Sequence, residues 1–73
     1  MKNVKIRVVE ATGSTRDTTV GKIYEGVYLD TGELQFDPPI AVDAPMLSFI
    51  DDIGDRLYTY VTRNLVEIVE GEE

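Results

Sequence analysis

Aspartate residues are the side chains in this sequence most able to do chemistry, and three of them cluster around a glycine in the stretch IDDIGD. Asp51, Asp52 and Asp55 lie beside Gly54, and closely spaced carboxylates can bind a calcium ion. A calcium loop of the EF-hand type needs acidic side chains at alternate positions before its glycine, and Ile53 takes one of those positions. Because Asp and Gly both favour turn backbones, the stretch is better explained as a tight turn. The sequence predicts no metal site here.

Enzymatic chemistry is poorly supported by the rest of the composition. The chain has 14 acidic residues and no histidine, so it lacks the usual neutral-pH base and any Ser-His-Asp arrangement. A catalytic carboxylate needs a raised pKa, normally from burial in a cleft, and a chain of 73 residues offers little cleft. The stretch GSTRDTTVGK lacks the spacing of a phosphate-binding P-loop. We therefore predict a protein that is not an enzyme and binds no cofactor.

Charge is distributed unevenly along the chain, and this is the most informative feature of the composition. Residues 1–22 carry five basic and two acidic groups, hence +3, whereas residues 23–55 carry eight acidic groups and no basic one, hence −8. Nucleic-acid binding depends on cations that displace counterions from phosphates, so we predict no direct binding of nucleic acid. An acidic surface instead speeds the encounter with a basic partner.

Two tyrosines could add contact area to such a surface. In RLYTYVT, Leu57, Thr59 and Val61 alternate with Tyr58 and Tyr60, so the tyrosines share the strand face opposite the aliphatic one. Exposed tyrosines are typical of binding patches, although a cross-strand aromatic pair that only stiffens the sheet explains them equally well. The candidate partner-binding residues are Asp30, Glu33, Asp37, Asp43, Asp51, Asp52, Asp55, Tyr58 and Tyr60.

The elements that must position these residues are short strands. Alternation and β-branched content predict strands over residues 3–11, 20–30, 46–50, 56–62 and 66–70, with a short returning strand at 34–36. Turns are predicted at Asp30–Glu33 and at 51–55, and Pro38, Pro39 and Pro45 rule out a central strand between them. Gly26 indicates a bulge or a sharp bend within its strand. A helix from Met46 to Ile53 is the main competing interpretation, because Pro45 would suit its first turn.

Such a chain can bury one apolar sheet face by curling into a small barrel. The link between the last two strands has room for a single 3₁₀ turn, which is typical of SH3-like barrels. The predicted fold class is therefore all-β, a five- to six-stranded SH3-like barrel, with an OB-like barrel as the alternative. We expect residues 1–70 to form this single domain and residues 71–73 to be a disordered acidic tail.

Two stretches give the chain a family resemblance. TTVGKIYEG, and IDDIGDRLYTY followed by LVEIVE, resemble the layout of small uncharacterised bacteriophage and prophage proteins with an SH3-like barrel. The segment LQFDPPIAVDAP is longer here than the usual link. The resemblance implies a phage-encoded protein of the host cytoplasm and carries over no catalytic residue. The absence of cysteine, of a signal peptide and of an apolar run long enough for a bilayer agrees with a cytoplasmic protein that contacts no membrane.

The leading functional hypothesis is a protein that binds, and inhibits, a host protein with a basic surface; its sharper version is a protein that imitates a nucleic-acid backbone. One alternative is a structural or assembly module that forms a homo-oligomer or a virion accessory part through its sheet edges. Another is a small-ligand sensor that uses the tyrosine face. The first hypothesis predicts a monomer until partner is added, whereas the second predicts a small homo-oligomer.

Overall fold

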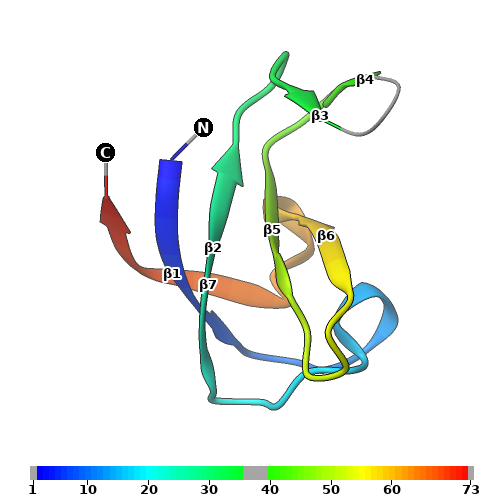
Figure 1. The fold of residues 1–73 in the computed structure, drawn as a ribbon, viewed down its shortest axis with the longest axis vertical. Helices are drawn as coiled ribbons and strands as arrows, with labels where there is room; N and C mark the ends of the chain where they lie inside the picture. The colour runs from blue at the N-terminus through cyan, green and yellow to red at the C-terminus, as the bar shows by residue number, and fades with distance from the viewer. Residues whose placement is uncertain (1, 36–39, 73) are drawn as a thin grey trace.

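The computed structural model describes residues 2–35 and 40–72. Its strands are β1 (Lys2–Val8), β2 (Ile23–Leu29), β3 (Leu34–Gln35), β4 (Ile40–Ala41), β5 (Met46–Ile50), β6 (Arg56–Tyr60) and β7 (Val66–Glu72). Two single-turn 3₁₀ helices accompany them, η1 (Gly13–Thr15) and η2 (Val61–Arg63). Figure 1 shows the β3–β4 hairpin at one end of the molecule and the β5–β6 turn at the other.

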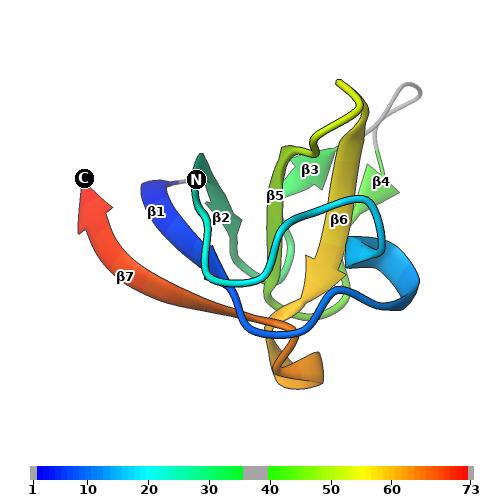
Figure 2. The same cartoon turned by 90° about the horizontal axis from the view of Figure 1, so that it is seen from below.

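Five strands form one open antiparallel sheet in the order β6-β5-β2-β1-β7, and β3 and β4 form a separate two-stranded sheet. The described part of the chain contains no α-helix, so the all-β prediction is confirmed. The competing helix over Met46–Ile53 is wrong, because Met46–Ile50 is a strand paired with both β2 and β6. Figure 2 shows how strongly the sheet curves, with β7 and β1 turned away from β5 and β6.

The inner face of this curved sheet holds the core. Alternate residues of β1, namely Val4, Ile6 and Val8, are buried, as the period of two along a strand requires. The core cluster consists of Val4, Ile6, Val8, Tyr24, Leu47, Phe49, Leu57 and Val66. Leu57 and Thr59 are buried while Tyr58 and Tyr60 are only half-buried. The predicted division of β6 into an aliphatic inner face and a tyrosine outer face is therefore confirmed.

Gly26 lies at the point where β2 begins to pair with β5. It pairs with Val4 of β1 and is the first residue of β2, in chain order, that pairs with β5, where it faces Phe49. A Cβ at this position would lie 2.3 Å from the carbonyl oxygen of Ser48. The pairing of β1 with β2 runs unbroken past Gly26. The glycine therefore marks a close approach of two strands, and the bulge lies instead between β1 and β7, beside Lys5 and Ile6.

Both predicted turns are present. Glu33 N donates to Asp30 O at 3.0 Å with Gly32 at φ +91°, and Gly54 N donates to Asp51 O at 3.2 Å with Gly54 at φ +88°. These positive φ values explain why glycine stands at both positions.

The predicted 3₁₀ link between the last two long strands is also present, as η2. Asn64 ends it in the left-handed region at φ +59°, a conformation that asparagine tolerates better than most residues. Strand β7 then continues beyond residue 70, the expected end of the domain. Gly71 and Glu72 pair with Val4 and Asn3, so only residue 73 of the expected tail lies outside the described residues.

The segment between β1 and β2 is folded against the sheet. Thr15 in η1 is completely buried, and its hydroxyl donates to the carbonyl oxygen of Glu10 at 2.7 Å. Asp52 N donates to Asp17 O at 3.0 Å, which joins this segment to the β5–β6 turn. A sequence that reads as a small, polar, flexible loop is thus anchored at its centre by one buried threonine.

Candidate functional site

Three carboxylates and one tyrosine gather where β2 ends and β5 begins. Asp30 and Glu33 belong to the turn after β2, and the Glu33 carboxylate accepts a hydrogen bond from the amide of Asp30. Gly32 N donates to Val42 O at 2.9 Å and Val42 N donates to Glu33 O at 3.0 Å. These bonds bring the segment that carries Asp43 back beside the turn. We call Asp30, Glu33, Asp43 and Tyr60 the acidic end of the molecule.

Tyr60 joins the acidic end through its hydroxyl. It lies opposite Met46 at the end of β6, and its hydroxyl donates to Asp43 Oδ1 at 2.8 Å. This hydrogen bond, together with the negative charge of Asp43, raises the pKa of Tyr60 above its ordinary value. The tyrosine is protonated at neutral pH, and its hydroxyl lies against Asp43. A carboxylate and the face of an aromatic ring both attract cations, so this pair suits contact with a cationic partner.

Tyr58 lies on the same outer face, farther from the acidic end. It pairs with Ser48 across β5 and β6 and is half-buried. Ser48 in turn pairs with Val27 of β2. Tyr58 therefore packs in the middle of the outer sheet face, whereas Tyr60 is at its margin. The two tyrosines share a face, as predicted, and the hydroxyl of Tyr60 contacts one of the predicted acidic residues, Asp43.

The carboxylates of the β5–β6 turn lie at the opposite end of β5. One residue of a strand adds about 3.3 Å, so the five residues of β5 separate the two acidic groups by roughly 17 Å. Asp51 Oδ1 accepts from Asp55 N at 2.8 Å and from Ile53 N at 3.2 Å. Such side-chain to backbone bonds are what makes Asp favourable in turns. Asp51 therefore stabilises its own turn, in agreement with the structural interpretation of IDDIGD.

Asp52 is the most heavily bonded carboxylate among the described residues. Its oxygens accept hydrogen bonds from Lys22 Nζ at 2.9 Å, from Thr19 Oγ1 at 2.7 Å and from the hydroxyl of Tyr24 at 2.8 Å. These bonds, that of Lys22 first, lower the pKa of Asp52 to about 2. Tyr24 also accepts a hydrogen bond from Thr19 N and packs its ring against Phe49 in the core, with centroids 4.9 Å apart. Asp52 thus joins the β5–β6 turn to the start of β2 and the segment before it.

The fold therefore divides the candidate partner-binding residues. Asp30, Glu33, Asp43 and Tyr60 come together, Tyr58 lies on the sheet face, and Asp51, Asp52 and Asp55 lie at the far end. Asp37 falls outside the described residues. The segment from 23 to 55 contains no lysine or arginine, but the fold brings Lys22 against Asp52. Negative charge at the far end is thereby partly neutralised.

Sequence reasoning missed the network around Asp52. Thr19 and Lys22 are 33 and 30 positions away from Asp52, and no local spacing connects them. Tyr24 lies in a predicted strand, and a buried tyrosine usually needs a partner for its hydroxyl. That general need was the one signal that could have indicated a nearby carboxylate.

Within residues 2–35 and 40–72, no three Asp, Glu, His or Cys side chains gather closely enough to hold a metal ion. The same part of the chain contains no helix of the length and apolarity needed to cross a membrane. Comparison with protein-family models, with curated proteins and with solved structures found no match.

Proposed function

We propose that this chain is a non-enzymatic protein-binding module with an SH3-like barrel, and that its acidic end binds a protein with a basic surface. The strand order and the 3₁₀ turn η2 between β6 and β7 support the barrel class. Consecutive strands β1, β2, β5 and β6 pair as neighbours, and β7 returns to pair with β1. The OB-like alternative is less well supported, because the last two long strands are joined by one short turn and lie at opposite edges of the sheet.

The observation that carries the functional proposal is the grouping of Asp30, Glu33 and Asp43 beside Tyr60. Backbone hydrogen bonds between the two neighbouring segments hold the group together, so its charges are held in place before a partner arrives. A preorganised surface loses less entropy on binding than a flexible one. Clustered charge of one sign also steers a basic partner towards it and makes binding sensitive to salt.

The resemblance to small phage proteins gives the proposal a sharper form. The partner would then be a host protein of the cytoplasm, and binding would inhibit it. Imitation of a nucleic-acid backbone requires a longer row of carboxylates than the acidic end offers, since Asp51 and Asp52 have structural bonds at the other end. We therefore favour recognition of a compact basic patch over nucleic-acid mimicry.

Capture from a bacterial lysate, followed by measurement on the purified partner, tests the proposal. The test variant is the double substitution Asp30→Asn and Asp43→Asn, which removes two charges from the acidic end and leaves the amide able to accept the Tyr60 hydrogen bond. The matched control is Glu10→Gln with Asp55→Asn, two exposed carboxylates away from the acidic end.

We expect the test variant to weaken binding about tenfold or more, and to flatten its dependence on salt. The control should change affinity by about twofold or less, because exposed charges far from a contact are screened. Equal loss in both variants, or binding that does not respond to salt, would contradict the role of the acidic end.

The assembly alternative is favoured by one observation, the unpaired outer edge of β7. Within the described residues β7 has β1 as its single neighbour, and Ile68 and Val69 are 44% and 42% exposed. An exposed edge is a template for pairing with a second copy. The acidic sequence VEIVEGE of this strand opposes such pairing by charge repulsion. Sedimentation velocity over a range of concentrations and salt distinguishes the two functions, because edge pairing predicts dimers that are favoured by salt.

A further inference from the structure

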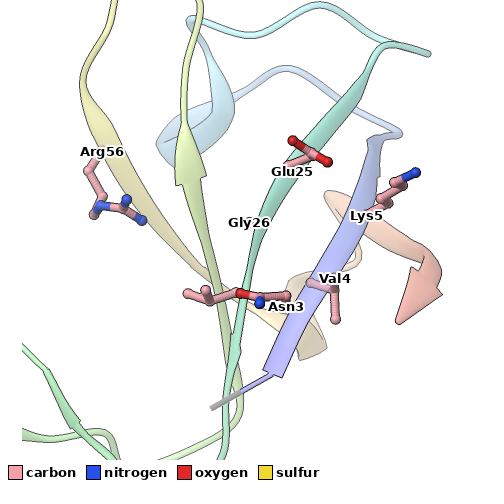
Figure 3. Close-up of a pocket in the computed structure, with 7 residues that line it drawn as sticks. Asn3, Val4, Lys5, Glu25, Gly26 and Arg56 are labelled. Atoms are coloured by element: carbon pink, nitrogen blue, oxygen red, sulfur yellow. The ribbon is translucent and has the colours of Figure 1, made fainter. Parts of the chain in front are cut away.

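The outer face of the main sheet contains a hollow that the acidic end does not include. It has a volume of about 360 Å³ and is lined by Asn3, Val4, Lys5, Glu25, Gly26, Val27 and Arg56. Figure 3 shows Arg56 on one side, Glu25 and Lys5 on the other, and Asn3 between them. Small-molecule sites in proteins span roughly 300–1,000 Å³, so the hollow has room for a small ligand.

The register of the strands explains why the hollow exists. Asn3, Val27, Ser48 and Tyr58 form one row across four strands of the sheet. Two residues farther along each strand, the next row on the same face contains the pairs Lys5–Glu25 and Ile50–Arg56. At this row β2 and β5 are not paired with each other. The two halves of the sheet diverge at this row, immediately beyond Gly26. The hollow is the space between them, and Val27 contributes an apolar side chain to its lining.

Arg56 is held in place at the wall of this space. Its Nη1 donates to Ser48 Oγ at 3.0 Å, and Ser48 is only 1% exposed although it lies on the outer sheet face. A guanidinium carries five N–H donors in a rigid fork, so one bond to Ser48 orients the group and leaves donors for a ligand. A buried hydroxyl that positions an exposed arginine is a feature of a built anion site, because it lowers the entropy lost when the arginine binds.

The charges of the hollow specify the kind of ligand. Lys5 and Arg56 are cationic and Glu25 is anionic. The Lys5 side chain extends away from Arg56 in Figure 3, so the guanidinium of Arg56, held on Ser48, is the cation that we assign to the ligand. A single negative charge of planar shape, a carboxylate, matches one guanidinium fork through two parallel hydrogen bonds. A doubly charged phosphate would be opposed by Glu25.

We propose that this hollow binds a small organic monocarboxylate, with the carboxylate on Arg56, the amide of Asn3 as a second donor, and a short apolar portion on Val27. The site is separate from the acidic end. It would bind an anion, whereas the acidic end would bind a cationic partner. It gives the chain a second recognition function, for a metabolite rather than for a protein.

Titrations followed by two-dimensional amide NMR test the site. The probe is sodium butyrate at constant ionic strength, with butyramide as its neutral analogue and inorganic phosphate as a competing anion. We expect saturable shifts at the amides of Asn3, Glu25, Gly26, Val27 and Arg56, with a dissociation constant in the millimolar range, and no such shifts with butyramide.

The variants separate a built site from general charge attraction. Arg56→Gln removes the fork, and Asn3→Asp, at an exposed position of the same shape, places a negative charge in the hollow. Both are expected to weaken butyrate binding about tenfold or more. Arg63→Gln makes the same charge change on η2, outside the hollow, and is expected to alter affinity by about twofold or less.

Several outcomes would overturn the proposal. They are shifts that do not saturate, equal shifts with butyramide, equal weakening by Arg63→Gln and Arg56→Gln, and tighter binding of phosphate than of butyrate. Because Asn3→Asp is conservative in shape, the site remains testable even if Arg56→Gln disturbs the fold.

Discussion

Substitution of Gly26 by alanine is expected to destabilise the fold for a reason that can be isolated. The added Cβ would lie 2.3 Å from Ser48 O, 2.9 Å from Ile6 Cδ1 and 2.9 Å from Phe49 Cβ. Gly26 is absent from the residues of positive φ, so its backbone suits alanine. Without the contacts, alanine would be favoured by roughly 0.5–1 kcal/mol over glycine inside a strand. The sign of the effect therefore depends on the contacts alone.

The magnitude follows from which atoms must move. Ser48 is paired with Val27 and Tyr58 on its two sides, so its carbonyl cannot retreat without disturbing both pairings. Overpacking a core costs about 1–3 kcal/mol and occasionally more, and a contact with a fixed backbone atom belongs at the upper end, about 3 kcal/mol. A domain of this size has a free energy of unfolding of roughly 4–11 kcal/mol. The melting temperature should fall by about 12 °C or more.

Urea and thermal unfolding followed by circular dichroism measure this loss. Gly21→Ala and Gly32→Ala are the matched controls, because a Cβ at either position meets nothing within 4 Å while φ is +85° and +91°. Each should cost only the strain of a left-handed residue, about 1–2 kcal/mol. A Gly26→Ala protein as stable as the unmodified one, or more stable, would refute the steric reasoning and the account of how the hollow arises.

Three further outcomes are expected. Thr59→Val should raise the free energy of unfolding by about 1 kcal/mol or more in urea titrations, because the Thr59 hydroxyl is buried and has no hydrogen-bond partner among the described residues; a loss of stability would show that a partner exists. Asp52→Asn should reduce the loss of folding stability at acid pH. The folded pKa of Asp52, about 2, lies below its ordinary 3.8, so its contribution is present above pH 3.8 and is lost as pH falls towards 2; unfolding at stepped acid pH should therefore show a smaller decline in the variant, and an unchanged decline would contradict the Lys22 contact. Asp43→Asn should lower the pKa of Tyr60 towards its ordinary value, as followed by ultraviolet absorbance of the phenolate. Because that pKa is raised in the fold, the associated stability is lost as pH rises through it, and an unaltered Tyr60 titration would rule out the contact with Asp43.

Local chemistry allowed much of the strand pattern to be predicted. Alternation in residues 3–8 and 56–60, together with Asp-Gly turns at 30–33 and 51–55, depends only on neighbours in sequence. The 3₁₀ turn after Tyr60 could be predicted for the same reason, since the link is too short for anything longer. The fate of Asp52 could not be predicted, because its partners Thr19 and Lys22 come from another part of the chain.

The sequence by itself determined an all-β chain with a strongly acidic middle segment, because side-chain alternation, turn residues and charge are properties of adjacent positions. Only the tertiary structure decided which acidic residues lie together. Pairing of distant strands placed Asp30, Glu33 and Asp43 at one end beside Tyr60, carried Lys22 onto Asp52 at the other, and opened a hollow beside Arg56. Electrostatic interactions weaken with distance in space. Which charges interact therefore depends on the strand register, because the register decides which side chains are neighbours.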